Sequence, residues 1–308
     1  MNVIDVSGLT KRFGNRTVVD NIGLRVRERE IVGFLGPNGS GKTTTIRMLC
    51  GLLVPDAAAG SCLGFDVLRD AEHIRLQTGY MTQKFSFYED LTIRENLDFV
   101  ARLYGLRPRR LKVEETLERI GLVDRRDQLA GSLSGGWKQR LALAACVMHE
   151  PKLLLLDEPT AGVDPQARRE FWDSIHALSD SGVTVLVSTH YMDEAERCHR
   201  IVYIMDGVIL ADGTIAELLA DAGLHTFTVQ GPDVTRLRPR LERQPGVEQV
   251  APFGDTLHVT GTDRAALLAA IEPLRADGSW TWTEGETSLE DLFIHLAALH
   301  RRGAADAR

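Results

Sequence analysis

The chain has 308 residues, 44% of them hydrophobic and 26% charged, with 36 basic against 43 acidic side chains and a formal net charge of −7. This length predicts about two domains, and the composition excludes a disordered or collagen-like chain. Because a general polyanion binder needs a surplus of basic residues, the charge argues against nucleic acid as a partner.

Neither a membrane span nor a secretory leader is expected. No apolar run approaches the roughly 18 residues that a span requires, and the first residues do not join a basic head to an apolar stretch. The four cysteines, at positions 50, 62, 146 and 198, lack metal-ligand spacing. They are typical of reduced thiols in a cytoplasmic protein.

Residues 1–222 are predicted to form an α/β domain. Short, continuously apolar runs are typical of parallel strands that helices bury on both faces. Three such runs span residues 30–35, 153–156 and 183–187. Between the last two, residues 165–178 have helical spacing, with Asp164 as the N-cap and Pro165 in the first turn. Strand, helix and strand in this order predict a βαβ unit of a parallel sheet.

Residues of about 85–150 show helical periodicity without a strand pattern. Thr92 and Glu95 have the spacing of a capping box, which marks the start of a helix. The predicted helices span residues 96–104, 113–120 and 136–149. We expect them to form a helical subdomain inserted into the α/β core.

Residues 223–308 are expected to form a small C-terminal accessory domain. Strand patterns occur at residues 227–229, 247–250, 257–259 and 280–282, and helical patterns at residues 233–243 and 263–274. The order β-α-β-β-α-β suits an α+β, ferredoxin-like domain. Ser288 and Asp291 form another capping box ahead of a last helix over residues 289–300.

A glycine-rich loop follows the predicted strand at residues 30–35. Residues 36–43 match G-x-x-x-x-G-K-[ST] between a strand and a helix, the context that this pattern requires. In such a loop, backbone N–H groups and the helix N-terminus surround phosphate oxygens. Lys42 then reaches the β- and γ-phosphates, and the Thr43 hydroxyl binds Mg²⁺. The nucleotide-contacting residues predicted here are Gly36, Pro37, Asn38, Gly39, Ser40, Gly41, Lys42, Thr43 and Thr44.

Three polar side chains stand at the ends of later strands. Asp157 ends the run at residues 153–156, so its carboxylate is expected at the carboxyl edge of the sheet, where ligands of open α/β sheets bind; there it suits Mg²⁺. Glu158 follows at once and either orients an attacking water or merely begins the next element. His190 ends the next strand near the same edge and either acts in catalysis or only completes a hydrogen bond.

A hydroxyl residue and two glycines, Ser134, Gly135 and Gly136, open a predicted helix. They form an anion-binding helix start without a local anion, unless they serve only as an N-cap with flexible glycines. With Ser134 placed 23 residues before Asp157, this segment resembles the signature of the nucleotide-binding subunit of ABC (ATP-binding cassette) transporters. The resemblance covers residues 3 to about 218, with the motifs in the family's order.

The resemblance implies a P-loop NTPase fold of the ABC-cassette type that binds ATP and Mg²⁺. Gln83 matches the glutamine of the Q-loop, which would ligate Mg²⁺ together with Thr43 and Asp157. Phe13 matches the aromatic residue that stacks on adenine. His190 matches the switch histidine that contacts the γ-phosphate.

The chain departs from the family pattern in two segments. Trp137 stands where glutamine is common in the signature, and the D-loop, residues 161–164, carries Gly-Val-Asp where Gly-Leu-Asp or Ala-Leu-Asp is frequent. The serine and glycines that face phosphate are intact, so we expect a competent signature.

The resemblance also implies a two-fold dimer of cassettes, with a second copy of this chain as the expected partner. In this family the signature of one chain, here Ser134–Gly136, closes over the ATP held by the phosphate loop of the other. ATP binding closes the dimer and hydrolysis reopens it. Glu158, Lys42 and His190 are the expected catalytic residues.

A polytopic membrane permease is the implied partner, which would hold the chain at the cytoplasmic face of the inner membrane. Three segments look like ABC-2-type exporter ATPases, which serve drug, antibiotic and polysaccharide efflux. They are residues 80–96, 133–140 and 288–293. The cluster Phe85, Phe87 and Tyr88 either lines a groove that receives a helix of the permease or lies buried in the subdomain.

Other classes of ABC ATPase are the alternatives. A chromosome-maintenance ATPase would need a long coiled-coil insertion, for which the 115 positions separating Lys42 from Asp157 leave no room. Translation factors of this superfamily carry two cassettes in one chain, whereas one is present here. A soluble regulatory or translation-type ATPase that is not coupled to transport is the alternative function.

Overall fold

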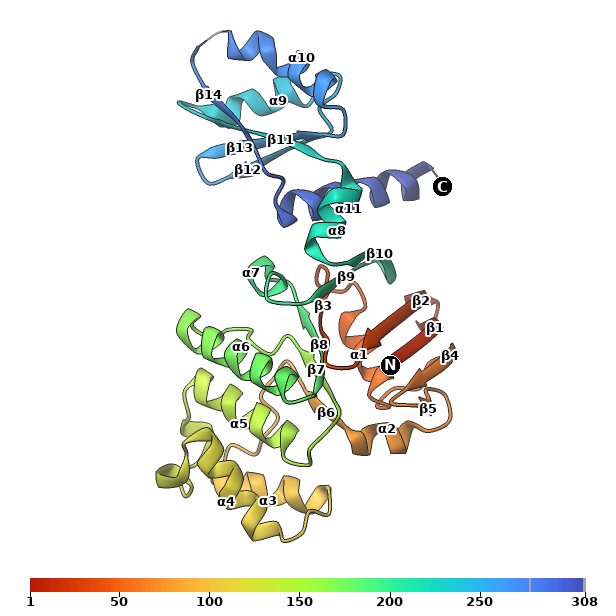
Figure 1. Cartoon of the computed structure of the whole chain (residues 1–308), viewed down its shortest axis with the longest axis vertical. Coiled ribbons are helices and arrows are strands. Elements are labelled where there is room, and N and C mark those ends of the chain that lie inside the picture. The colour runs from red at the N-terminus through yellow and green to blue at the C-terminus, as the bar shows by residue number, and fades with distance from the viewer. Residues whose placement is uncertain (277, 307–308) are drawn as a thin grey trace. The chain divides into compact units, whose positions relative to one another are not determined.

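The computed structural model describes residues 1–276 and 278–306. The chain divides into two compact units, Met1–Ile209 and Leu210–Arg308 (Figure 1). Each unit has a hydrophobic core of its own. In the described part of the chain, no helix is long and apolar enough to cross a membrane.

A six-stranded sheet with the order β10-β9-β3-β8-β7-β6 forms the centre of the first unit. The neighbours from β9 to β6 are paired in parallel. The inner strands are β3 (Ile31–Leu35), β8 (Thr184–Thr189) and β7 (Leu153–Asp157), and the outer ones are β9 (Arg200–Met205), β10 (Val208–Gly213) and β6 (Thr78–Met81). The three inner strands are buried along their whole length, which confirms the parallel strands predicted from the apolar runs.

Helices pack on both faces of this sheet. Alternate residues of a strand point to opposite faces, and along β7, Leu153 and Leu155 join one apolar cluster whereas Leu154 and Leu156 join another. The first cluster contains residues of α1 (Lys42–Leu49), and the second contains residues of α5 (Gly135–Val147) and α6 (Pro165–Asp180). The Asp164 carboxylate accepts hydrogen bonds from the Gln166 and Ala167 amides at 3.1 and 3.0 Å, which confirms the predicted N-cap of α6. The short helices are α2 (Ala71–Gln77) and α7 (Met192–Ala195).

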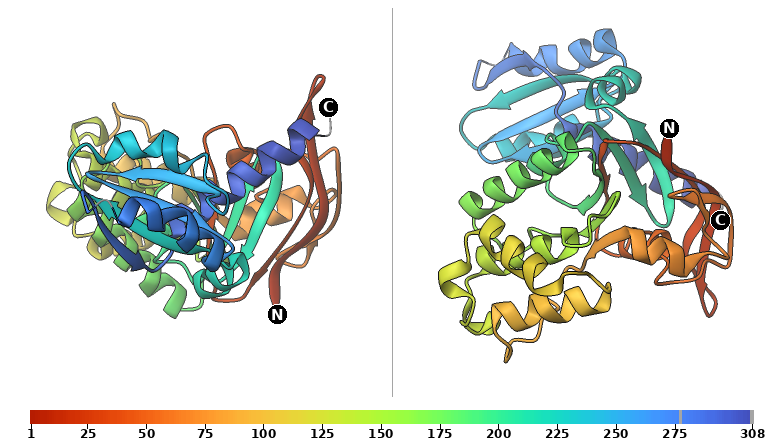
Figure 2. Two further views of the ribbon diagram at one scale, coloured as in Figure 1. Left: turned by 90° about the horizontal axis from the view of Figure 1, so that it is seen from above. Right: turned by 60° about the horizontal axis from the view of Figure 1, so that its bottom comes forward.

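A second, antiparallel sheet is a feature that the sequence analysis does not predict. Its strands are β1 (Asn2–Phe13), β2 (Arg16–Arg27), β4 (Ala57–Cys62) and β5 (Phe65–Asp66), in the order β2-β1-β4-β5. In β2, Ile22, Leu24 and Val26 are buried and the residues between them are exposed. This alternation is the sequence signal of a half-buried strand, and a search for continuous apolar runs misses it. In Figures 1 and 2 this sheet, in red and orange, lies at the opposite end of the unit from α3 and α4, in yellow.

The helical segment contains α3 (Ile93–Leu103), α4 (Arg109–Ile120) and the signature helix α5. These helices enclose an apolar cluster of their own. The predicted capping box is confirmed, because the Thr92 hydroxyl accepts a hydrogen bond from the Glu95 amide and the Glu95 carboxylate accepts one from the Thr92 amide. The expected start of α3 at residue 96 is wrong, since an N-cap at Thr92 puts the first helical residue at Ile93. Two short 3₁₀ turns follow, η1 (Val123–Arg125) and η2 (Ala130–Ser132).

The second unit is built around a four-stranded antiparallel sheet with the order β12-β13-β11-β14. Its strands are β11 (His225–Gln230), β12 (Gln249–Phe253), β13 (Thr256–Gly261) and β14 (Thr281–Gly285). Its helices are α8 (Ile215–Ala222), α10 (Arg264–Arg275) and α11 (Leu289–Asp306). The second capping box is present: the Ser288 hydroxyl accepts from the Asp291 amide at 3.1 Å, and the Asp291 carboxylate accepts from the Ser288 amide at 3.1 Å.

Two predicted helices of this unit differ from the observed ones. The helix expected over residues 233–243 is a 3₁₀ turn, η3 (Val234–Leu237), followed by the single turn α9 (Arg238–Leu241). Pro239 explains the break, because proline has no N–H with which to continue a helix that reaches it from η3. The last helix continues past the expected end at residue 300 to Asp306.

Candidate functional site

The loop between β3 and α1 has a backbone that only glycine accommodates at two positions. Gly36 has φ 157°, and a Cβ there would lie 2.1 Å from the Ile204 carbonyl oxygen. Gly41 has φ 108°, and a Cβ there would lie 2.8 Å from the Val18 carbonyl oxygen. These glycines therefore let the loop turn tightly against the surrounding backbone, as a loop that surrounds an anion with backbone N–H groups must do.

A polar cavity of about 390 Å³ opens above this loop. Its lining includes both the loop and residues brought from later in the chain: Val18, Asn38, Gly39, Gly41, Lys42, Thr43, Thr44, Gln83 and Glu158. The buried hydroxyl of Ser40, in the same loop, finds no hydrogen-bond partner in the described part of the protein. A cavity lined by backbone N–H groups, hydroxyls and a lysine suits a phosphate chain.

Lys42 begins α1, and its side chain is 5% exposed. Its Nζ donates to the Gly36 carbonyl at 2.7 Å and to the Pro37 carbonyl at 3.2 Å, and it lies 3.5 Å from Glu158 Oε1. Burial lowers the pKa of the Lys42 ammonium, whereas the nearby Glu158 and Asp157 carboxylates oppose that change. The lysine is thus held by protein carbonyls and one carboxylate, all of which a bound phosphate could replace.

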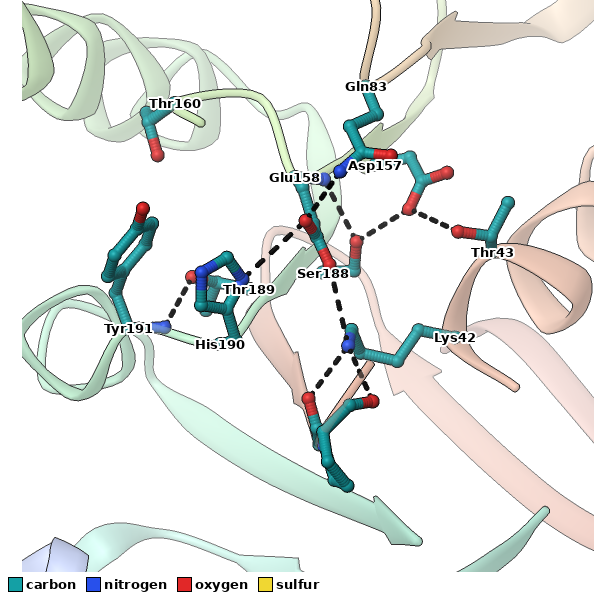
Figure 3. Close-up of polar contacts among 12 residues, drawn as sticks. Lys42, Thr43, Gln83, Asp157, Glu158, Thr160, Ser188, Thr189, His190 and Tyr191 are labelled. Atoms are coloured by element: carbon teal, nitrogen blue, oxygen red, sulfur yellow. Dashed lines mark hydrogen bonds and ion pairs between the residues drawn. The ribbon is translucent and has the colours of Figure 1, made fainter. Parts of the chain in front are cut away.

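Asp157 ends β7 and connects two other elements through one oxygen. Its Oδ1 accepts hydrogen bonds from the Thr43 hydroxyl at 3.0 Å and from the Ser188 hydroxyl at 2.8 Å. The Ser188 hydroxyl in turn accepts from the Glu158 amide at 2.9 Å (Figure 3). Sequence reasoning misses Ser188, although a polar residue near the end of the apolar strand β8, two positions before His190, is a signal that could have found it.

Glu158 lies at the centre of the site (Figure 3). Its Oε2 accepts a hydrogen bond from Gln83 Nε2 at 2.9 Å and lies 3.5 Å from His190 Nδ1, while its Oε1 faces Lys42. The backbone of Glu158 has φ 47°, a left-handed conformation that is uncommon outside glycine and that clusters at functional sites. The structure therefore brings together side chains from three separate segments of the sequence around one carboxylate.

Two groups of predicted residues lie apart from this cluster. Phe13, at the end of β1, is 51% exposed, and the Lys11 ammonium lies 5.7 Å from the centre of its ring. Ser134 and Gly136 line a different cavity, of about 340 Å³, at the start of α5. This separation within one chain is the arrangement that a signature acting on a second chain requires.

The aromatic cluster at residues 85–88 is partly buried in the helical segment and also lines a cavity, so both predicted alternatives apply to it in part. Phe85 and Phe87 pack partly against the apolar cores, yet they also line a cavity of about 210 Å³ together with Tyr88. Tyr88 is 52% exposed, and its ring meets that of Phe99 edge to face at 5.5 Å. The cavity is lined mainly by aromatic and aliphatic side chains, which makes it an apolar recess in the helical segment.

The fold and the site define a P-loop ATPase. The protein-family model "ABC transporter" matches residues 19–161. The chain is 37% identical over 301 residues to "Nod factor export ATP-binding protein I" of Burkholderia pseudomallei (strain 1710b), covering 95% of this chain and 96% of that protein. It is 47% identical over 222 residues to "Probable multidrug ABC transporter ATP-binding protein YbhF" of Escherichia coli (strain K12), covering 71% of this chain. In that comparison the chain spans 38% of the length of the relative.

A solved structure supports the same assignment. "Structure of ATP binding subunit of ABC transporter" superposes with a TM-score of 0.64 at 30% sequence identity, covering 71% of this chain and 92% of the other. The chain belongs to the ATP-binding subunits of ABC transporters. It is an ATPase subunit of that family, similar to one subunit named for export and to another named as a probable multidrug subunit.

Proposed function

We propose that this chain binds and hydrolyses ATP to drive an ABC-2-type membrane exporter through closure and reopening of a cassette dimer. The observation that carries this proposal is the convergence of Lys42, Gln83 and His190 on Glu158 beside the phosphate loop. Export is favoured over import because the relatives are named "Nod factor export" and "multidrug" proteins.

ATP is expected to bind with its phosphates against the loop and its adenine on Phe13. Insertion of the γ-phosphate moves Lys42 from its present carbonyl partners to phosphate oxygens, which are charged acceptors and therefore stronger ones. Glu158, released from Lys42, then orients or deprotonates the attacking water, and His190 contacts the γ-phosphate. Ser134, Gly135 and Gly136 complete the site from the second cassette, for which an identical chain is the expected source.

The residues at the edge of the sheet fit Mg²⁺. The Thr43 hydroxyl and the Asp157 carboxylate lie 3.0 Å apart, and hydroxyl, carboxylate and amide oxygens are the hard donors that Mg²⁺ prefers. Thr43, Asp157 and Gln83 would hold the ion, which when bound neutralises charge that develops on the phosphates. Ser188 orients the Asp157 carboxylate toward Thr43 by donating to the same oxygen.

The coupled partner is a polytopic ABC-2-type permease, which would hold the chain at the cytoplasmic face of the inner membrane. The apolar recess lined by Phe85, Phe87 and Tyr88 is a suitable receptor for a helix of the permease. We also propose the domain division at residues 222 and 223, with the helical subdomain at about residues 85–150. The strand order β12-β13-β11-β14 supports a ferredoxin-like assignment for the C-terminal domain.

The test is capture of the permease by a trapped ATPase. The Glu158→Gln variant is loaded with Mg-ATP and used to isolate partners from detergent-solubilised membranes. Lys42→Ala, which should bind nucleotide about tenfold to a hundredfold more weakly, is the matched bait. Mass spectrometry should find one polytopic membrane protein enriched on the first bait and depleted on the second. Recovery of soluble partners alone, with ATPase activity intact, would move the assignment to a regulatory cassette.

A further inference from the structure

The signature helix α5 begins without the usual local stabilisation. Ser134 is its N-cap, but the Ser134 hydroxyl makes no capping hydrogen bond, and the first turn contains no acidic residue. The first two helical positions are Gly135 and Gly136, and glycine is among the weakest helix formers. By contrast, Thr92 at the start of α3 and Thr214 at the start of α8 both form complete capping boxes. Something other than the local sequence must therefore hold the start of α5.

Trp137, the third residue of α5, supplies that support. Its side chain is partly buried against the apolar cluster of the helical segment, which includes Leu133 and Leu141. Two guanidinium groups lie on its ring: that of Arg140 at 5.0 Å from the ring centre and that of Arg125 at 5.7 Å. Among aromatic side chains, tryptophan attracts cations most strongly. Its ring therefore connects the start of α5 to Arg125 of the η1 turn and to Arg140 in the next turn of α5.

The same residues connect α5 to α6. The Arg140 guanidinium forms an ion pair with the Glu170 carboxylate of α6. Gly136 lies so close to α6 that a Cβ built on it would be 2.8 Å from the Ala167 Cβ. The start of α5 is thus placed by contacts on two sides, of which Trp137 provides the one toward the helical segment.

We infer that Trp137 is a positioning residue for ATP hydrolysis: it holds Ser134–Gly136 in the orientation in which they meet the nucleotide of the second cassette. Trp137 acts through the backbone of the first turn and through Arg125 and Arg140. This inference rests on the proposed function for its effect on catalysis, but its effect on the helix start belongs to the single chain.

Hydrogen exchange of the full-length chain tests the effect on the helix start without nucleotide. The Lys138 amide donates to the Ser134 carbonyl at 2.9 Å, the first hydrogen bond of the helix. Trp137→Ala should speed exchange at this amide by about tenfold, because the first turn opens more often. Trp137→Phe keeps an aromatic ring next to the two arginines and should restore exchange to within about threefold of the wild-type rate. Equal exchange in all three proteins would overturn the inference, whether or not the chain hydrolyses ATP.

Steady-state ATPase kinetics test the effect on catalysis. Trp137→Ala should lower kcat by about tenfold or more, since small displacements of a positioned group are costly. KM for ATP should change less than about twofold, because the phosphate loop of each chain is untouched. Trp137→Phe should recover most of the lost kcat. A rise in KM with kcat unchanged, or the same loss in the alanine and phenylalanine variants, would overturn the assignment.

A gentler variant covers the case in which Trp137→Ala does not fold. Arg125 is exposed, so Arg125→Gln removes one cation from the ring without opening the core, and kcat should fall about two- to threefold. Arg110→Gln, an exposed arginine of α4, is the matched control and should leave kcat unchanged. Equal kcat values for the two arginine variants would contradict the role of the cation–π contact between Arg125 and Trp137. An inactive wild-type chain with the expected exchange pattern would instead refute the proposed function alone.

Discussion

Glycines and a hydroxyl residue lie at or just before the starts of two helices of the first unit, α1 and α5, yet the surroundings of the two starts differ. The start of α1 is supplied with partners from its own chain: Lys42, the Thr43–Asp157 hydrogen bond and the Glu158 cluster all meet there. At the start of α5, the Ser134 hydroxyl makes no capping hydrogen bond, and the first turn contains no acidic residue. A helix start with glycines and a hydroxyl residue therefore belongs to a nearly complete nucleotide site at α1, but supplies only part of a site at α5.

The phosphate loop and the signature differ in how many side-chain partners their own chain supplies. The phosphate loop lies at the carboxyl edge of a sheet, where side chains from β7 and β8 converge on it. The signature lies on a helix whose contacts, through Trp137 and Gly136, position the backbone without supplying a ligand. In the proposed dimer, the signature of each chain completes the nucleotide site at the phosphate loop of the other chain.

The largest effect is expected at the complete site, from Glu158→Gln. Loss of the carboxylate should lower kcat by about a thousandfold, within the range for removal of a general base, and ATP binding should persist because the phosphate loop is intact. Gel filtration with Mg-ATP should then show a stable dimer. A monomer peak under these conditions would contradict action of the signature across two chains.

Lys42→Ala should have the next largest effect. Removing a buried ammonium that would contact phosphate should weaken ATP binding by about tenfold to a hundredfold, from about 1.5–3 kcal/mol per charged hydrogen bond. Titration with a fluorescent ATP analogue measures this loss. Lys152→Ala, a lysine outside the cavity lining, is the control and should bind as the wild type does.

Ser134→Ala and Thr92→Ala should give opposite results. Ser134 makes no capping bond, so its loss should leave Tm unchanged and lower kcat about tenfold through a lost contact to the nucleotide of the second chain. Thr92 completes a capping box, so its loss should cost about 1 kcal/mol of folding free energy and leave kcat unchanged. Thermal unfolding and ATPase assays on both variants check this; a destabilised Ser134→Ala variant would mean that the serine is a cap after all.

The smallest expected effect is the loss of folding stability at low pH when the Glu95 carboxylate is protonated. Hydrogen bonds from the Thr92 amide and hydroxyl hold the pKa of the Glu95 carboxyl below its ordinary value of 4.5. Because the folded-state pKa is depressed, the stabilisation by the capping box is present above about pH 4.5 and is lost as the pH falls through the lower folded value. Urea unfolding at pH 6 and pH 3.5 should show a smaller decrease for Glu95→Gln than for the wild type. An equal decrease would show that the capping box does not contribute.

Some features could be predicted because they depend on neighbours in the chain. The inner parallel strands appear as continuous apolar runs, and the caps at Thr92, Asp164 and Ser288 can be read from three- or four-residue patterns. The phosphate loop can likewise be read from a local pattern, the spacing of glycines, lysine and threonine over residues 36–43. The first antiparallel sheet was missed because strands such as β2 alternate buried and exposed residues, and a search for continuous apolar runs does not find them.

The sequence alone shows which residues can carry the chemistry and in which order they occur. The folded structure adds that Ser188 links Asp157 to Glu158 and that Gln83, Lys42 and His190 contact Glu158. It also adds that two guanidinium groups lie over the Trp137 ring. The two kinds of feature differ in the sequence separation of the residues that interact. Caps, turns and buried strands are specified by interactions over a few residues, whereas the site joins strand ends and loops up to 148 positions apart in the chain (Lys42 to His190), and their meeting depends on the packing of the whole sheet.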